Sequence, residues 1–193
     1  MRRLIALALA VLVSIAVAAC GDGDKTVTTT PTTSAPEQQT TTTQPPTSTP
    51  SAAPSAASVG GTLNLTGTDE GENLAVTVVK VVDPARAKNE FSSPESGERF
   101  VAVQFRLRNT GSAVYDDSPD NGAKVRDTQG QQFSASIEET AAGPGFGGSV
   151  TLVPGDTALG FITFEVPTAS KIAKIQFAMA SGFAGNVGQW NVP

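Results

Sequence analysis

The chain has 193 residues, a net charge of −5 and an aromatic content of only 6%. It contains no histidine and a single cysteine, Cys20. The absence of histidine excludes Ser-His-Asp and Cys-His catalysis and removes the most common transition-metal ligand, and no cofactor is expected. Without Arg2 and Arg3 the net charge is −7, which argues against a nucleic-acid partner because the phosphates would be repelled.

Residues 1–19 have the organisation of an export signal. Arg2 and Arg3 precede an apolar run, Leu4 to Val17, that is shorter than the about 20 residues a membrane-spanning helix needs. Small residues then lead directly to the cysteine. The sequence Val17-Ala18-Ala19-Cys20 resembles the lipobox of bacterial lipoproteins.

This resemblance implies that the sulfur of Cys20 carries a diacylglyceryl group and that residues 1–19 are removed. Two acyl chains give durable membrane binding, whereas one is marginal. The expected location is therefore the outer face of the bacterial cell membrane, with the membrane itself as a partner through the lipid anchor. The alternative is an ordinary secretory signal peptide followed by a free thiol.

Residues 20–58 begin with Cys20 and continue as a linker poor in apolar side chains. The segment after the cysteine holds 12 Thr, 6 Pro and 5 Ser. Such a composition cannot bury enough apolar surface to offset the entropy of ordering, which predicts a disordered tether. An O-glycosylated stalk is the alternative, since Thr/Pro-rich extracellular segments often carry sugars.

Residues 59–193 are long enough for one domain with its own core. Short β-branched and aromatic runs alternate there with Gly, Pro, Asn and Asp. This pattern predicts an all-β fold, with strands over 61–66, 74–82, 99–109, 124–127, 131–134, 150–153, 158–166, 173–179 and 188–192. The polar segment 85–97 is expected to be a loop, with a short helical turn near Ala87 as an option.

The strand over 99–109 has the clearest alternation. Val101, Val103, Phe105 and Leu107 are expected to face the core, and Ala102, Gln104, Arg106 and Arg108 to face water. In 74–82 the alternation breaks, which indicates either two covered faces or a bulge near Val79-Lys80. Pro84 is expected to end that strand. Later strands are expected to bury Ile162, Phe164, Val166, Ile175, Phe177, Met179 and Trp190.

A family resemblance is carried by strand and turn motifs in a fixed order. They are Gly97-Glu98-Arg99-Phe100-Val101-Ala102-Val103 through Asn109-Thr110-Gly111, Pro154-Gly155, Gly160, and Phe164-Glu165-Val166-Pro167. They resemble the telokin-like, immunoglobulin-related domain of unknown function found in lipoproteins of Gram-positive bacteria, and small secreted mycobacterial antigens are similar in kind. The resemblance implies an immunoglobulin-like antiparallel β-sandwich and brings no catalytic residues.

Three local patterns are candidates for chemistry. Asp116, Asp117 and Asp120 offer the hard oxygen ligands that calcium prefers, although the same residue types form ordinary turns. Gly143 to Gly148 has the G-x-G-x-x-G spacing but lacks the strand and helix of a dinucleotide site, so a loop is expected. Glu138-Glu139 are paired carboxylates, but adjacent residues of an extended chain point to opposite sides.

The expected function is that of a non-enzymatic, surface-anchored lipoprotein whose sandwich binds a protein or a cell-envelope component. A small-ligand carrier or an accessory subunit of a transporter is the alternative within the binding class. A carboxylate-based envelope hydrolase is the alternative from another class. An apolar pocket would favour a carrier, and convergent carboxylates in a cleft would favour an enzyme.

Overall fold

The structure is a computed structural model that describes residues 55–193. The signal peptide, the lipid attachment at Cys20 and the tether as far as residue 54 lie outside the described residues. The elements are β1 (Ser55–Ser58), β2 (Thr62–Thr66), β3 (Asn73–Ala85), β4 (Glu98–Asn109), β5 (Tyr115–Asp117), α1 (Pro119–Gly122), β6 (Ala123–Asp127), β7 (Gln132–Ser136), β8 (Val150–Leu152), β9 (Thr157–Pro167), β10 (Ile172–Ala178), the 3₁₀ turn η1 (Ala180–Gly182) and β11 (Val187–Asn191).

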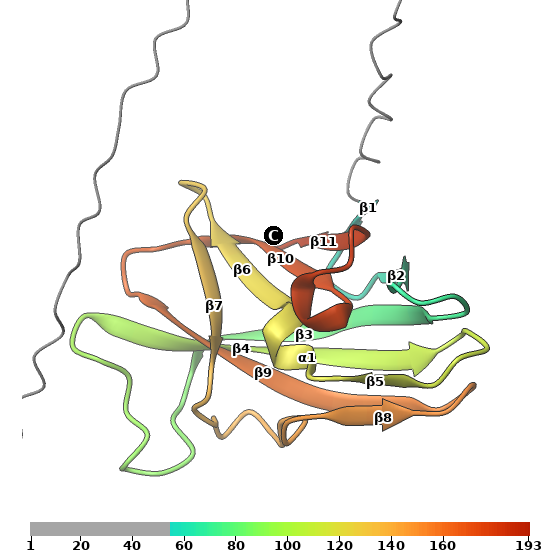
Figure 1. Cartoon of the computed structure of the whole chain (residues 1–193). Coiled ribbons are helices and arrows are strands. Elements are labelled where there is room, and N and C mark those ends of the chain that lie inside the picture. Colours follow the sequence, from blue (N-terminus) through green and yellow to red (C-terminus); the bar gives the residue numbers. More distant parts are fainter. Residues whose placement is uncertain (1–54) are drawn as a thin grey trace, which may run out of the picture. The chain divides into compact units, whose positions relative to one another are not determined.

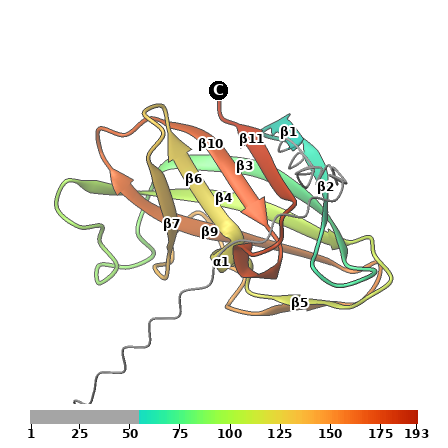
Figure 2. The same cartoon turned by 45° about the horizontal axis from the view of Figure 1, so that its top comes forward.

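Nine of these strands form one continuous hydrogen-bonded order, β1-β11-β10-β6-β7-β9-β4-β3-β2. The order folds over at β7, because residues 132–134 pair with β6 and residues 135–136 pair with β9. One layer then contains β6, β10, β11 and β1, the other contains β9, β4, β3 and β2, and β7 runs between them (Figures 1 and 2). The predicted all-β sandwich is confirmed.

The side chains between the two layers form the main core. Phe105 of β4 packs against Phe177 of β10 and Trp190 of β11, with ring centroids 5.6 and 6.4 Å apart. The Trp190 indole N–H donates to the carbonyl oxygen of Gly61 at 2.9 Å, so this large side chain is buried without an unpaired donor. All the side chains expected to face the core from β4, β9 and β10, together with Trp190, are buried.

The outward face of β4 is only partly exposed to water. Arg106 and Arg108 are exposed as predicted, whereas Ala102 is fully buried, so that expectation was wrong. Ala102 belongs to a second cluster with Ala85, Phe100 and Phe161 on the outer side of the sheet. We name these four residues the outer cluster. Segments 86–97 and 137–149 cover them, which the period of a single strand does not reveal.

The bulge, one of the two alternatives given for the broken alternation in 74–82, is present in β3. The register between β3 and β4 shifts after Val78, so that Lys80 pairs with Gln104 and points outward while Val81 faces the core side. Pro84, however, does not end the strand, because β3 continues to Ala85 with a second register shift. The partner β2 reaches only as far as Thr77 along β3, so Pro84 lies where one side has no strand to pair with.

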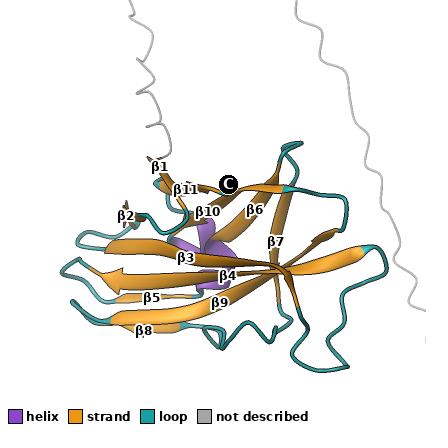
Figure 3. Cartoon of the chain, turned by 180° about the vertical axis from the view of Figure 1, so that it is seen from behind, coloured by secondary structure: helices purple, strands orange, loops and turns teal. Residues whose placement is uncertain are grey.

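Four elements were not predicted from the sequence: β1, β5, α1 and the 3₁₀ turn η1. β1 begins at Ser55, inside the segment assigned to the linker, and pairs in parallel with β11. β5 pairs with β8 and lies beside the layer of β4 and β9 (Figure 3). α1 is a single helical turn that begins at Pro119, a favoured residue at the first helical position. No helix forms near Ala87, which makes an isolated bridge with Thr140 instead.

Two buried polar side chains fix the loops at the ends of the sandwich. Asp127 Oδ1 accepts bonds from the amides of Gln129 and Gln131 in the β6–β7 turn, where Gly130 has the positive φ that favours glycine. Asn109 joins the end of β4 to β8 by donating to the carbonyl oxygen of Leu152 at 2.8 Å. Within residues 55–193, no helix is long and apolar enough to cross a membrane.

Candidate functional site

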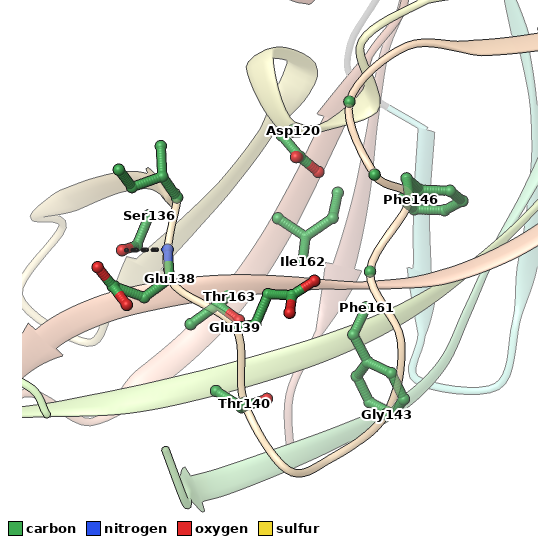
Figure 4. Close-up of a pocket in the computed structure, with 14 residues that line it drawn as sticks. Asp120, Ser136, Glu138, Glu139, Thr140, Gly143, Phe146, Phe161, Ile162 and Thr163 are labelled. Carbon is green, nitrogen blue, oxygen red and sulfur yellow. Dashed lines mark hydrogen bonds between the residues drawn. The ribbon is translucent and has the colours of Figure 1, made fainter. Parts of the chain in front are cut away.

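A cleft of about 230 Å³ opens on the outer side of β9. Its walls come from α1, the end of β7, β9 and the connection between β7 and β8 (Figure 4). We name it the Asp120 cleft, and its lining residues are Asp120, Ser136, Ile137, Glu138, Glu139, Thr140, Gly143, Gly145, Phe146, Gly147, Gly148, Phe161, Ile162 and Thr163.

The β7–β8 connection is held by backbone hydrogen bonds to the β3–β4 connection and to β9. The amide of Lys88 donates to the carbonyl oxygen of Glu139 at 3.1 Å, and the amide of Ala141 donates to the carbonyl oxygen of Arg86 at 2.8 Å. Further along, the amide of Phe161 in β9 donates to the carbonyl oxygen of Pro144 at 2.9 Å. An exposed ion pair between Lys88 and Glu139 adds to these contacts. One wall of the cleft is therefore a loop fixed at three points rather than a regular strand.

Glycines in and opposite this loop make room for two phenylalanine rings. A Cβ on Gly143 would lie 2.6 Å from the Phe161 ring, and a Cβ on Gly160 would lie 2.8 Å from the Phe146 ring. Gly143 of the G-x-G-x-x-G pattern is thus required for close packing. The next element is the strand β8, so no helix N-terminus follows the pattern to bind phosphates. The expectation of a loop at Gly143 to Gly148 is confirmed.

Two polar atoms in the cleft are buried without a hydrogen-bond partner, Asp120 Oδ1 and Thr140 Oγ1. In the part of the chain that the structure describes, they are the only such side-chain atoms. Thr140 is 3% exposed, whereas Asp120 is half-buried with one oxygen turned into the cleft. Burial raises the pKa of Asp120 because the charged carboxylate loses hydration. Unpaired buried acceptors are uncommon in proteins and call for an explanation.

The two neighbouring glutamates do not act as a pair. In Figure 4 the carboxylate of Glu138 points away from the centre of the cleft, while that of Glu139 points in the other direction, over the cleft. Glu139 is also bound by Lys88. The predicted divergence of Glu138 and Glu139 is therefore seen, and it places them on different sides of the loop. Ile137, just before them, lines the cleft and is 98% exposed, which leaves an apolar side chain at its mouth.

The aspartates considered as calcium ligands are separated by the fold. Asp116 accepts a bond from Thr151 in β8, and Asp117 accepts bonds from the amide and the hydroxyl of Ser181 in η1. Asp120 faces the cleft instead. Among residues 55–193, no three His, Cys, Asp or Glu side chains gather closely enough to hold a metal ion. The three aspartates thus do not form a common ligand set, and Asp117 serves to fix the η1 turn.

A larger and more open cavity, of about 670 Å³, lies at the end of the sandwich where the chain terminates. Its apolar lining comes from Val59, Val79, Val81, Ile172 and Val192. The guanidinium of Arg99 lies there, but it is already bound by Asp83 at 2.7 Å and by two backbone carbonyl oxygens. The donors of Arg99 are therefore engaged within the domain, and among the described residues no buried side-chain atom without a hydrogen-bond partner belongs to the lining of this cavity.

The Asp120 side chain is expected to oppose folding at neutral pH. Its pKa is higher in the folded than in the unfolded state, so ionisation disfavours the fold above the raised pKa. Asp120→Asn should therefore raise the melting temperature at pH 7, by a few degrees at most because solvent screens the half-exposed carboxylate. The gain should shrink as the pH falls toward the ordinary aspartate pKa of about 4.

Melting temperatures of both proteins between pH 4 and 8 measure this effect. The charged groups around the cleft and its neighbouring hollow are Glu138, Glu139, Lys88 and Lys124, and none of them makes an ion pair with Asp120. Asp156→Asn, at an exposed turn, is the matched control and should change the melting temperature little at any pH. An Asp120→Asn protein less stable than wild type at pH 7 would contradict the expectation.

The sequence identified part of this cleft. Asp120, Glu138 and Glu139 were singled out, whereas Thr140, Phe146 and Phe161 were not. Ser118-Pro119 at the start of α1 is a helix-start signal that could have separated Asp120 from Asp116 and Asp117. For Thr140 no sequence signal exists, because its unpaired hydroxyl depends on segments that are distant along the chain.

The fold is shared with one solved structure of low sequence identity, and a second solved structure matches more weakly. MPT63, a secreted protein from Mycobacterium tuberculosis, is 18% identical with a TM-score of 0.53, over 72% of this chain and 98% of that one. The yjhA protein from Bacillus subtilis is 18% identical with a TM-score of 0.48, over 71% and 99%. No curated protein matches the sequence. Residues 64–187, most of the sandwich, match the family described as "Domain of unknown function (DUF4352)", and the chain belongs to that family.

Proposed function

We propose that the protein is a non-enzymatic binding lipoprotein of the cell envelope, held at the outer face of the membrane by acylated Cys20. The lipobox Val17-Ala18-Ala19-Cys20 supports the anchor, and the Thr/Pro-rich linker supports a spacer between anchor and domain. MPT63 is described as secreted. An extracytoplasmic position is proposed for this chain as well.

The Asp120 cleft is the proposed binding site of this domain. The observation that carries the proposal is that both unpaired buried side-chain atoms of the described residues line this one cleft. A binding site that hydrogen-bonds its ligand leaves unpaired polar groups when the ligand is absent. Phe146, Phe161 and Ile162 add the apolar walls that small-ligand sites share.

Binding is favoured over hydrolysis because of how the carboxylates lie. A glycosidase needs two carboxyl groups that flank one bond. Glu138 points away from the cleft centre, and Glu139 is engaged by Lys88. The chain also lacks histidine as a general base. Asp120 is left as the one carboxyl group turned into the cleft without a partner, which suits recognition better than acid–base catalysis.

The anchor is tested by Cys20→Ala. Without the thiol no diacylglyceryl group can be attached, so we expect the protein to leave the membrane fraction and appear in the medium. Fractionation of cells followed by immunodetection measures this. Ser14→Ala, within the apolar run, is the control and should stay in the membrane fraction. Retention of the Cys20→Ala protein with the membranes would overturn the lipid-anchor assignment.

The binding site is tested by photo-crosslinking in intact cells. A photoreactive residue at Ile137, at the mouth of the cleft, should trap an envelope component, and Ser136→Phe, which fills the cleft, should abolish that adduct. Phe183 is 87% exposed and does not line the cleft, so the same probe there is the matched control. An Ile137 adduct that persists in the Ser136→Phe protein would show that the cleft is not the binding site.

A further inference from the structure

The Asp120 cleft has the chemistry of an acceptor site. Asp120 Oδ1 and Thr140 Oγ1 are both buried and unpaired, and Figure 4 shows their side chains at opposite ends of the cleft. An ionised carboxylate only accepts hydrogen bonds, and a threonine hydroxyl can accept as well as donate. A ligand that satisfies this site must therefore bring N–H or O–H donors.

The charge around the cleft is negative. Asp120, Glu138 and Glu139 belong to its lining, and no lysine or arginine does. Glu139, whose carboxylate lies on the cleft side, is already neutralised by Lys88, which leaves Asp120 without an ion-pair partner in the cleft. An anionic ligand would be repelled, and a neutral donor would leave the buried charge uncompensated. A cationic donor satisfies both requirements.

Lys124, which lies beside the cleft, makes its hydrogen bond to β7 rather than to Asp120. Lys124 shares a neighbouring hollow with Asp120, but its Nζ donates to Ser134 Oγ at 3.1 Å on β7. Within residues 55–193, the ion pairs are Lys88–Glu139 and Arg99–Asp83, so no lysine or arginine forms one with Asp120. The domain thus leaves the counterion of this carboxylate to be supplied from outside.

The size and the apolar walls of the cleft narrow the choice of cation. A volume of about 230 Å³ lies below the range of about 300–1,000 Å³ typical of drug-sized ligands. The Phe146 and Phe161 rings and Ile162 offer contacts to methylene groups and to a positive charge. A metal ion does not suit, because no three carboxylates gather at this place among the described residues.

We infer that the Asp120 cleft binds a primary ammonium group at the end of a short alkyl chain, such as an aliphatic amine or a lysine side chain. The ammonium group donates to Asp120, and the alkyl chain lies along Phe146 and Ile162. A second donor on a longer ligand would reach Thr140. This inference rests on the proposed function and specifies the ligand class for the same cleft.

The test uses the full chain in detergent micelles and three probes of equal length: pentylamine, 1-pentanol and pentanoate. Isothermal titration calorimetry should show binding of pentylamine that is about tenfold or more tighter than that of 1-pentanol, since charge-assisted hydrogen bonds are roughly twice as strong as neutral ones. Pentanoate should not bind. Equal binding of amine and alcohol, or binding of pentanoate, would overturn the inference.

Variants assign the binding to the cleft. Asp120→Asn should weaken pentylamine binding about tenfold or more, whereas Asp156→Asn, the matched control at an exposed turn outside the cleft, should change it less than about twofold. Lys124→Gln should leave binding unchanged. Amine binding that appears only in the Lys124→Gln protein would overturn the inference, because it would show that Lys124 neutralises Asp120 in solution.

The outcomes separate the ligand class from the proposed function. If the Ile137 crosslink depends on the cleft but pentylamine is not preferred over 1-pentanol, the ammonium inference fails and the binding function stands. If pentylamine binds in an Asp120-dependent manner but the Ile137 crosslink persists in the Ser136→Phe protein, the proposed envelope partner fails and the ammonium site stands.

Discussion

Phe105→Asp is expected to abolish the cooperative unfolding transition of the domain. Phe105 is fully buried and contacts Phe177 and Trp190 across the two layers. Truncating a buried phenylalanine costs about 3–5 kcal/mol. An unpaired carboxylate in the same position adds a further penalty, and domains of this kind have only about 5–15 kcal/mol of stability. Circular dichroism during thermal and urea denaturation measures the loss.

Two variants control for this substitution. Arg106→Asp introduces the same side chain one position along β4, where it points to water, and should change stability by less than about 0.5 kcal/mol. Phe105→Leu keeps the position apolar and should remain folded, with a lower melting temperature. A Phe105→Asp protein that melts like wild type would show that the inward face of β4 has been assigned incorrectly.

Asn109→Leu should be the second most damaging of the substitutions considered. The Asn109 amide donates to the carbonyl oxygens of Ala113 and Leu152, each at 2.8 Å, and its Oδ1 accepts from the amide of Gly111 at 2.9 Å. Leucine has a similar volume but leaves these groups without their partner. Each buried unpaired group costs about 1–3 kcal/mol, and we expect a total loss of roughly 3–5 kcal/mol.

Urea denaturation should show a lower midpoint concentration for the Asn109→Leu protein. An unchanged dependence of the unfolding free energy on urea would show that the substitution lowers stability without changing the surface exposed on unfolding. Thr110→Ala, at the exposed next position, is the matched control and should shift the midpoint little. The β5–β8 pair should loosen together with the β4–β5 connection, because Asn109 bonds to both. A change below about 1 kcal/mol would mean that these amide bonds contribute little net free energy in solution.

The fold could be predicted wherever apolar side chains recur at every second position, which is the period of a strand. The alternation in β4 predicted four buried side chains correctly. The break in alternation near Val79-Lys80 left two alternatives, of which the bulge is the one present in β3. Ala102 was assigned incorrectly because its burial depends on two segments, 86–97 and 137–149, that cover the outer face of the sheet. Local periodicity cannot report what a distant loop covers.

The candidate site could be predicted only in part for a related reason. Asp116, Asp117 and Asp120 are neighbours in the sequence, which suggested a shared site, but β5 and α1 direct them to different surroundings. The unpaired state of Asp120 and Thr140 results from contacts between α1, the β7–β8 connection and β9. Such contacts are a property of the assembled domain rather than of any one segment.

The outer cluster is packed separately from the main core, and this separation bears on how stably the cleft wall is held. Phe100, Ala102 and Phe161 are packed apart from the main core, and the cleft wall lies on them through a few backbone hydrogen bonds. Segments with few buried contacts open at lower free energy than the sandwich as a whole. The cleft wall is therefore expected to open at a lower free energy than the two sheets, which would stay intact when it does.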